Sequence, residues 1–372
     1  MSKLIIEKKD LTHNIKKIKE FASKSGPDDK GKNIKIIAVV KANAYGLDMK
    51  QYVEFLIDNG IDFFAVSTVE EAIRFRKLGF KEKLLMLSST SVKKDVETLV
   101  KNNIILSVGS KEAVNIANEV AKENRKKIKV HLKIDTGFGR YGFMYYNRDE
   151  IVESLKNSDN IEIEGTFTHF SNAYYDDKYT KKQFQRFIDC IEVLKMNDIK
   201  TGMLHVCNSS AFIKFPHMHL NAVRIGSAFL GRLSFKNNFG LKKIGKLESK
   251  VSEIKFIRKG EYIGYSNAYK TKKDIKIAVI PCGYVEGFNL KSGRDMYRKI
   301  DTFRNLVGEF KNLFRNQSLY VKIKGKKLKV LGRVGTYHTI IDITNENIEI
   351  GDKTEMSVNP TLINNLVERK YI

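Results

Sequence analysis

The sequence is poor in cysteine and proline, with 3 Cys and 4 Pro among 372 residues. Cys190, Cys207 and Cys282 are widely separated and form no Cys-x-x-Cys pair. This spacing argues against a disulfide framework and against a zinc ribbon, and no metal site is expected. The cysteine usage favours a reducing compartment, so a cytoplasmic protein is expected.

Long hydrophobic runs are also missing. Apolar segments such as residues 34–40 (IKIIAVV) have the length of a strand, whereas a membrane helix needs roughly 20 apolar residues. Residues 1–21 carry a charge every few positions and lack the apolar core of a signal peptide. We therefore expect neither export nor membrane insertion.

Positive charge is in excess, because 67 Lys and Arg against 43 Asp and Glu give a net charge of +24. Clustered cations would favour nucleic-acid binding, since they release counterions from phosphates. Here the lysines are spread along the whole chain, as is typical of solvated surfaces. No nucleic-acid partner is expected, and DNA or RNA binding stays as an alternative that rests on charge alone.

Within residues 1–240, short β-branched runs alternate with segments that are apolar at three-to-four spacing. The strand-like runs are residues 35–41, 63–68, 83–89, 104–108, 129–134, 162–168, 202–206 and 222–225. The helix-like segments include residues 69–78, 111–123 and 180–194. About eight β-then-α units predict an α/β domain of the (β/α)8 barrel type.

Residues 241–372 contain strand-like pieces and little helix, which predicts a second, mostly β domain. The pieces are residues 247–258, 275–280, 319–323, 328–334 and 339–343. Residues 295–314 look helical or irregular and are interpreted as a surface insertion. The first few residues of the chain are candidates for pairing with this second domain.

Polar residues follow the predicted barrel strands. Lys41 ends an apolar strand in AVVKANAYG (38–46), where a lysine at the mouth of a barrel could form a Schiff base. Taken alone, such a lysine commonly just faces solvent, His169 could be a core histidine and Arg140 a surface cation. Together they share one rim, which favours a site over a structural explanation. The rim set is Lys41, Arg140, His169, Asn208, Ser209 and Arg224.

The motifs around these residues resemble those of alanine racemases over nearly the full length of the chain. They are AVVKANAYG, HLKIDTGFGRYG, THFSNA, HVCNSSA, VRIG, GYSNAY and GYVEG, in the family's order and at compatible spacings. The resemblance implies a barrel followed by a β domain, with pyridoxal 5'-phosphate as cofactor. It also implies interconversion of L- and D-alanine, with the product used in cell-wall synthesis.

The resemblance also assigns roles to two bases. Lys41 matches the lysine that binds the cofactor covalently and acts on the D-enantiomer, and Tyr265 matches the base that acts on the L-enantiomer. Racemisation needs one such group on each face of the substrate carbon. In the family Tyr265 and Tyr284, which narrows substrate access, come from the partner subunit, so a homodimer with composite sites is implied.

Other matches concern cofactor and substrate. Arg224 matches the arginine on the pyridine nitrogen, which it leaves unprotonated because a guanidinium keeps its proton. His169 matches the histidine that links Arg224 toward Tyr265. Tyr45, Asn208, Ser209, Gly226 and Ser227 match the phosphate site, the last two as a backbone N–H pair at a helix N-terminus. Arg140 matches the contact to ring hydroxyl and substrate carboxylate, and Lys133 a lysine that is carbamylated in many members.

One departure concerns the substrate wall. After Gly-Arg-Val the family usually has Cys-Met-Asp, whereas this sequence has Gly335-Thr336-Tyr337. The backbone N–H of Thr336 can still bind the substrate carboxylate, but the side-chain change leaves alanine specificity open. A serine or broader small-amino-acid racemase is the nearest alternative, and a non-catalytic cofactor carrier is another. The role of Tyr371 near the atypical C-terminus stays open.

Overall fold

The computed structural model describes residues 2–25, 34–233, 239–291, 299–314 and 319–372. The chain divides into two compact units. One comprises Lys9–Ile244, and the other combines Met1–Lys8 with Gly245–Ile372. The first unit is called the barrel unit below, and the second the β unit.

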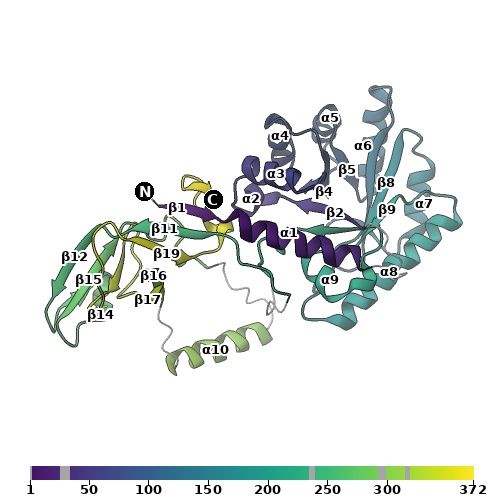
Figure 1. Ribbon diagram of the computed structural model, residues 1–372. Coiled ribbons are helices and arrows are strands. Elements are labelled where there is room, and N and C mark those ends of the chain that lie inside the picture. The colour runs from purple at the N-terminus through teal and green to yellow at the C-terminus, as the bar shows by residue number, and fades with distance from the viewer. Residues whose placement is uncertain (1, 26–33, 234–238, 292–298, 315–318) are drawn as a thin grey trace. The chain divides into compact units, whose positions relative to one another are not determined.

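Eight parallel strands form a nearly closed barrel in the barrel unit (Figure 1). They are β2 (Lys35–Val39), β3 (Phe63–Val66), β4 (Lys83–Ser89), β5 (Ile105–Val108), β6 (Ile128–Asp135), β8 (Ile161–Phe167), β9 (Met203–His205) and β10 (Ala222–Ile225). Along the sheet their order is β10-β2-β3-β4-β5-β6-β8-β9, with β7 (Phe143–Met144) beside β6. Backbone hydrogen bonds from Asn221 to Leu204 (3.0 Å) and from Arg224 to Cys207 (2.9 Å) join the two ends. The predicted (β/α)8 barrel is confirmed.

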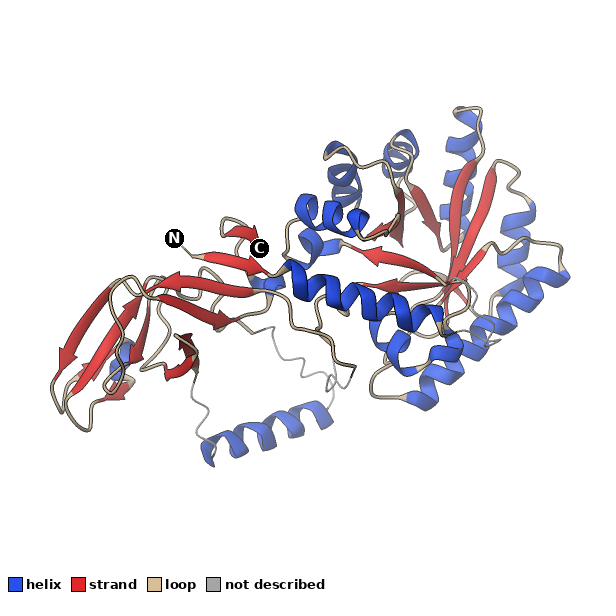
Figure 2. Cartoon of the chain, in the orientation of Figure 1, coloured by secondary structure: helices blue, strands red, loops and turns tan. Residues whose placement is uncertain are grey.

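Helices surround these strands (Figure 2). They are α1 (Lys8–Ser23), α2 (Lys41–Tyr45), α3 (Met49–Asp58), α4 (Val69–Lys77), α5 (Lys93–Lys101), α6 (Lys111–Glu123), α7 (Arg148–Lys156), α8 (Asp177–Met196), α9 (Ser209–Lys214) and the 3-10 turn η1 (Pro216–Met218). Two of them are capped by a hydroxyl side chain, α4 by Thr68 and α6 by Ser110, whose Oγ accepts the Ala113 N–H at 3.1 Å. One face of α6, which includes Ala117 and Ala121, is buried. Capping and amphipathic spacing therefore place this helix as the sequence predicts.

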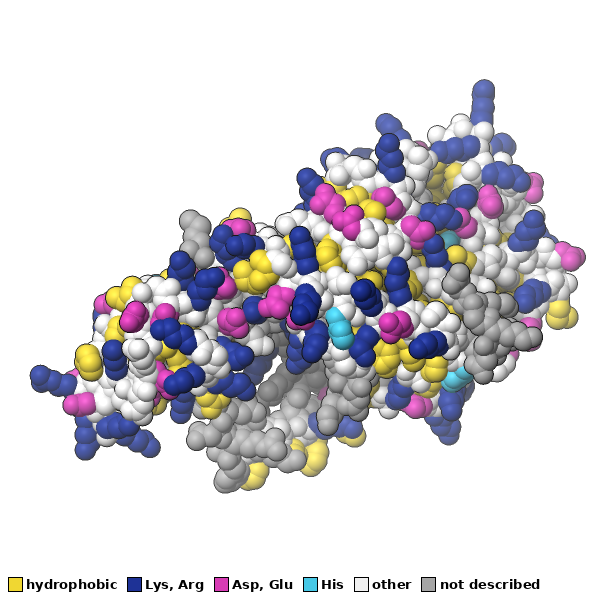
Figure 3. Space-filling model, viewed as in Figure 1, with side chains coloured by type: hydrophobic (Ala, Val, Ile, Leu, Met, Phe, Trp, Pro, Cys, Tyr) yellow, Lys and Arg dark blue, Asp and Glu magenta, His cyan; other side chains and the backbone are white. Residues whose placement is uncertain are grey.

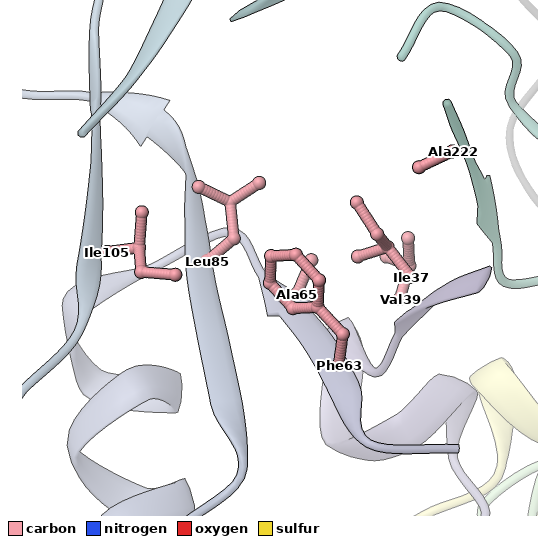
Figure 4. Packing of buried hydrophobic residues seen from close by; sticks show 7 residues of the cluster. All are labelled: Ile37, Val39, Phe63, Ala65, Leu85, Ile105 and Ala222. Carbon is pink, nitrogen blue, oxygen red and sulfur yellow. The ribbon is translucent and has the colours of Figure 1, made fainter. Parts of the chain in front are cut away.

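The barrel interior is filled by side chains from alternate positions of neighbouring strands. Figure 4 shows them pointing toward one another from β2, β3, β4, β5 and β10: Ile37, Val39, Phe63, Ala65, Leu85, Ile105 and Ala222. None is more than 7% exposed, so the barrel is a packed core and not a pore. Such a core holds the strand ends, and hence the rim residues, in fixed positions.

The described residues of the β unit form three sheets. Its strands are β1 (Lys3–Ile6), β11 (Lys246–Lys250), β12 (Glu253–Ile257), β13 (Tyr262–Ile263), β14 (Tyr269–Lys270), β15 (Ile275–Ile280), β16 (Tyr320–Ile323), β17 (Lys326–Lys329), β18 (Thr339–Asp342), β19 (Lys353–Ser357) and β20 (Glu368–Tyr371). The sheet orders are β17-β16-β19-β11-β1-β20, β12-β15-β18 and β13-β14. The start of the chain belongs to this unit, because β1 lies between β11 and β20. The unit also contains η2 (Tyr265–Asn267), η3 (Pro360–Leu362) and the helix α10 (Lys299–Phe314).

Some expected boundaries in the β unit are wrong. Residues 247–258 form two strands in different sheets, because Val251 donates its N–H to Asp352 while Ser252 donates its N–H to Val279, each at 2.9 Å. The prediction of one strand over residues 328–334 is wrong, because β17 ends at Lys329 and Val330 adds a single bridge. β19 and β20 were not expected, since charged and polar residues interrupt them. Of the expected insertion, residues 299–314 form α10, and residues 295–298 lie outside the described residues.

The surface carries charges of both signs (Figure 3). Lysines pair with neighbouring carboxylates, as Lys93 does with Glu119 and Glu123 at 2.6 Å. Such pairs sit in solvent and contribute little to stability. Among the helices that the structure describes, none is long and apolar enough to span a membrane.

Candidate active site

Lys41 is exposed and follows the C-terminal end of β2. The next four residues all have left-handed backbone, with φ of 54° at Ala42, 50° at Asn43, 56° at Ala44 and 55° at Tyr45. For residues other than glycine this conformation costs roughly 1–2 kcal/mol each. The surrounding structure must therefore hold this turn in place.

Glu71, in the first turn of α4, stabilises this turn. Its Oε1 accepts the Ala42 N–H at 2.5 Å, and its Oε2 accepts the Ser67 N–H at 3.1 Å. One carboxylate thus joins the turn after β2 to the end of β3. This contact fixes the backbone from which the Lys41 side chain extends.

Tyr45 and Ser209 place two hydroxyl groups beside the backbone of Gly226. A Cβ atom at Gly226 would lie only 2.2 Å from Tyr45 Oη, so this approach requires glycine. Ser209 Oγ accepts the N–H groups of Gly226 at 3.1 Å and Ala228 at 3.3 Å. Burial, followed by the charge of Glu71, raises the pKa of Tyr45 to about 12, so its phenol remains a hydrogen-bond donor.

Asn208 and Ser227 lie in the same part of the rim. Asn208 caps α9, because its Oδ1 accepts two backbone N–H groups at 3.0 and 3.1 Å. The expected helix N-terminus after the last barrel strand is wrong. Instead, the chain makes consecutive turns, in which the carbonyls of Gly226 and Ser227 each accept an N–H at 3.1 Å.

Arg224 on β10 is 2% exposed, and its guanidinium makes four hydrogen bonds. It donates to the Nδ1 and carbonyl of His205 at 2.8 Å each, to the Thr168 carbonyl at 2.7 Å and to the Val206 carbonyl at 3.1 Å. Burial lowers the pKa of Arg224 to about 10, so the group remains a cation at neutral pH. The site therefore contains a rigid, buried positive charge.

His169 follows β8 and is half-buried, with its ring edge-to-face against Phe138 at 5.4 Å between centroids. Burial and then the charge of Arg224 hold the pKa of His169 well below its ordinary value. His169 therefore lies in the electric field of Arg224, while the four hydrogen bonds of that guanidinium are made to other groups.

Lys133 on β6 is 4% exposed and donates to the Leu87 carbonyl at 2.8 Å. Its ammonium also lies 5.0 Å from the ring centroid of Tyr141 and 5.2 Å from that of Phe167. Burial, and then the charges of Arg140 and Arg224, lower the pKa of Lys133 to about 7. At neutral pH much of this side chain is an uncharged amine.

Arg140 lies on the loop after β6, and Asp135 holds that loop. The carboxylate of Asp135 accepts four successive backbone N–H groups, from residues 137–140, at 2.7 to 2.9 Å. The exposed Arg140 guanidinium packs 4.3 Å from the Phe138 ring centroid. The loop backbone is therefore fixed, while the Arg140 head group faces solvent.

The remaining candidates belong to the β unit. The Tyr284 hydroxyl is hydrogen-bonded to Thr336 Oγ1 at 2.9 Å, and the Tyr284 N–H donates to the Gly335 carbonyl at 3.1 Å. A Cβ atom at Gly335 would lie 3.9 Å from the Tyr265 ring. The structure thus brings Tyr265, Tyr284 and Thr336 together in one cluster, in which Tyr265 is 73% exposed.

Comparison with known proteins identifies the family. A model of the alanine racemase N-terminal domain matches residues 6–233, and one of the C-terminal domain matches residues 244–365. The chain belongs to the alanine racemase family. Alanine racemase 1 of Caldanaerobacter subterraneus subsp. tengcongensis is 32% identical over 351 residues, which cover 92% of this chain and 82% of that protein.

Further relatives agree with this family membership. Alanine racemase of Methanococcus maripaludis is 31% identical over 349 residues, covering 92% of this chain and 85% of that protein. The solved alanine racemase of Clostridium difficile 630 matches with a TM-score of 0.83 and 28% identity, covering 100% of this chain and 95% of that one. Like other members of the alanine racemase family, the chain is therefore an isomerase of the racemase type, and the family depends on pyridoxal phosphate.

Several residues of the candidate site are not predicted from the sequence. Glu71 had a visible signal, since Thr68 and Glu71 have the spacing of a helix capping box. Asp135, His131 and His205 lie within the family-like motifs, but no sequence signal distinguishes them from structural residues. Among the described residues, no group of three or more His, Cys, Asp or Glu side chains is placed to hold a metal ion.

Proposed function

We propose that this chain interconverts L-alanine and D-alanine with pyridoxal 5'-phosphate bound at the rim of the barrel unit. The observation that carries this proposal is the convergence of three features at the C-terminal strand ends. They are the constrained turn after Lys41, the hydroxyl pair beside Gly226 and the buried cation of Arg224. Family membership supports the racemase chemistry.

The donor set fits an anionic pyridine cofactor. Tyr45, Ser209 and the backbone N–H of Ser227 would hold the phosphate, because the two hydroxyl groups lie beside this backbone, where the N–H groups of Gly226 and Ala228 fix Ser209 Oγ. Arg224 would hold the ring nitrogen, and Arg140 the ring hydroxyl and the substrate carboxylate. When bound, pyridoxal phosphate supplies the electron-withdrawing group that makes the substrate Cα proton acidic.

Lys41 and Tyr265 would move that proton on opposite faces of the substrate carbon. Lys41 Nζ takes or returns it on the side of the D-enantiomer, and Tyr265 Oη does so on the side of the L-enantiomer. Tyr265 comes from a second copy of the chain in this proposal, so the active form is a homodimer with two composite sites. The 73% exposure of Tyr265 in a single chain is consistent with that arrangement.

Lys133 is a candidate for carbamylation. Carbon dioxide adds to an uncharged amine, and burial keeps the pKa of Lys133 at about 7. A carbamate there would place negative charge next to Arg140 and Arg224, whose positive charges now disfavour the ammonium form. In the proposed enzyme this modified lysine orients Arg140.

Serine racemisation is the second candidate, and one contact favours it. Thr336 presents a hydroxyl where the family usually has methionine, and that hydroxyl is hydrogen-bonded to Tyr284 at 2.9 Å. A polar pair near the substrate side chain could accept the hydroxyl of serine in place of a methyl group. The choice between alanine and serine therefore depends on this pair.

Proton NMR in deuterated water tests the proposal. The purified protein is supplied with pyridoxal phosphate, and loss of the Cα proton is followed for L-alanine and L-serine in competition. Faster loss from alanine supports alanine racemisation, and faster loss from serine transfers the assignment to the second candidate. Loss from neither, with the cofactor bound, would overturn the racemase proposal in favour of a cofactor carrier.

A further inference from the structure

A line of buried polar groups continues from Arg224 into the barrel. His205 Nδ1 faces Arg224 Nη1 at 2.8 Å, and His205 Nε2 faces His131 Nδ1 at 2.8 Å. Both histidines are 0% exposed. Arg224, His205 and His131 thus form one hydrogen-bonded chain, called the histidine relay below.

The charge of Arg224 fixes every proton in the relay. A guanidinium can only donate, so His205 Nδ1 must be the acceptor and His205 carries its proton on Nε2. His205 donates that proton to His131 Nδ1. The single ring proton of His131 is therefore on its Nε2. Protonation of His131 Nδ1 would set two N–H groups against each other, so both rings are neutral. Burial agrees, since it lowers the pKa of His131 to about 4 and that of His205 well below its usual range.

The barrel is built to admit the His131 ring. A Cβ atom at Gly165 on β8 would lie 2.6 Å from His131 Cε1 and 2.8 Å from its Nδ1, so no larger residue fits at this position. The His205 ring stacks on Phe167 at 4.9 Å between centroids, with an interplanar angle of 6°. Glycine and phenylalanine on one strand therefore set the positions of both imidazoles.

We propose that His131 is a positioning residue for the cofactor site. By accepting the Nε2 proton of His205, it holds the His205 ring in the orientation and tautomer that present Nδ1 to Arg224. The Arg224 guanidinium, which can only donate, would thereby be held in the orientation that directs an N–H at the pyridine nitrogen. This inference rests on the proposed function, in which Arg224 holds that nitrogen.

The direct test is nitrogen NMR of the cofactor-loaded protein with 15N-labelled histidine. The expected result is neutral His131 and His205, each protonated on Nε2, with a scalar coupling between His205 Nε2 and His131 Nδ1 across their hydrogen bond. This measurement needs no variant and no catalytic turnover. A His205 protonated on Nδ1, or no coupling, would overturn the proposal.

Two substitutions of His131 test its influence on the cofactor. His131→Leu removes the acceptor, so we expect kcat to fall roughly 10-fold or more with little change in KM, together with a shifted cofactor absorption band. His131→Asn keeps an oxygen near the position of Nδ1 and should restore most of both signals. Equal effects of the two variants on kcat would contradict a role as hydrogen-bond acceptor.

A matched control separates this role from general packing. His219 is also 0% exposed and stacks on Phe212 at 4.8 Å, but its Nε2 bonds to the Phe212 carbonyl at 2.7 Å, outside the relay. His219→Leu should lower the melting temperature while leaving the His205 signals and the cofactor band unchanged. A wild-type protein that shows the coupling but racemises no amino acid would refute the proposed function and leave the relay intact.

Discussion

The carboxylate of Glu71 accepts the backbone N–H of Ala42 at 2.5 Å and so connects two consecutive β/α units of the barrel. Ala42 is the first of four left-handed residues after Lys41. Without an external partner such a turn would relax toward the right-handed region, because each residue stores roughly 1–2 kcal/mol. The direction of Lys41 thus depends on a residue 30 positions later in the chain.

Glu71→Gln should lower activity while the protein stays folded. The glutamine amide has one oxygen, which can still accept one of the two backbone N–H groups. Its NH2 group faces the other backbone N–H and cannot accept it, so one charge-assisted hydrogen bond worth roughly 1.5–3 kcal/mol is lost. We expect about a tenfold or larger fall in kcat/KM and weaker retention of pyridoxal phosphate during dialysis. The neighbouring, exposed Glu70 provides the control. If Glu70→Gln reduced activity equally, the effect would reflect net charge and not the turn.

Gly226→Ala should displace the Tyr45 phenol. The added methyl group would lie 2.2 Å from Tyr45 Oη, so the side chain must move away from the hydroxyl pair with Ser209. We expect cofactor affinity, measured by titration of the apoprotein, to fall roughly tenfold or more, as for loss of one strong hydrogen bond. Gly308→Ala in α10 meets no atom within 4 Å and should leave affinity unchanged. Unaltered affinity in the Gly226 variant would remove Tyr45 from the phosphate site.

The barrel was predictable because its strands are short, mostly apolar runs whose central residues are buried. β4 and β10 lie where the sequence predicts them, at Lys83–Ser89 and Ala222–Ile225. In the β unit the periodicity fails, since β20 (ERKY) is mostly charged and forms a strand through its pairing with β1. Pairing between the two ends of a chain leaves no local pattern in the sequence.

The positions of Lys41 and Arg224 at the ends of barrel strands were predictable, because each belongs to a short apolar run. The site was not predictable where function rests on backbone geometry or on long-range contacts. No local signal shows that Glu71 bonds to Ala42 or that Gly165 makes room for His131. The hydrogen bond between Arg224 and His205 likewise depends on ring positions that only the packed barrel defines.

Lys133 should become carbamylated more completely as pH rises. A protonated lysine cannot attack carbon dioxide, and with a pKa of about 7 the reactive amine fraction of Lys133 grows between about pH 6 and about pH 8. We expect one carbamate signal in 13C NMR with labelled bicarbonate, stronger at the higher pH. Lys129→Arg, on the exposed side of the same strand, should keep the signal, whereas Lys133→Arg should lose it. Retention of the signal in Lys133→Arg would place the modification elsewhere.

Tyr265→Phe should abolish proton exchange from one enantiomer only. Loss of a general base slows its step roughly 10²–10⁴-fold, so exchange of the L-alanine Cα proton in deuterated water should nearly stop. Exchange from D-alanine, which depends on Lys41, should continue. Tyr262→Phe changes another exposed tyrosine of the same segment and serves as the control. Equal loss for both enantiomers would contradict the division of labour between Lys41 and Tyr265.

A mixture of two inactive variants tests whether Tyr265 acts across subunits. In a dimer of Lys41→Ala and Tyr265→Phe chains, one composite site contains both alanine and phenylalanine, while the other contains the original lysine and tyrosine. If half of the dimers are mixed, activity should recover to roughly a quarter of the wild-type value. The recovery requires subunit exchange, so it should appear after the variants are denatured and refolded together, and not after simple mixing of tightly paired dimers. If Lys41 and Tyr265 acted within a single chain, no mixture would contain a complete site, and activity would stay at the level of the separate variants.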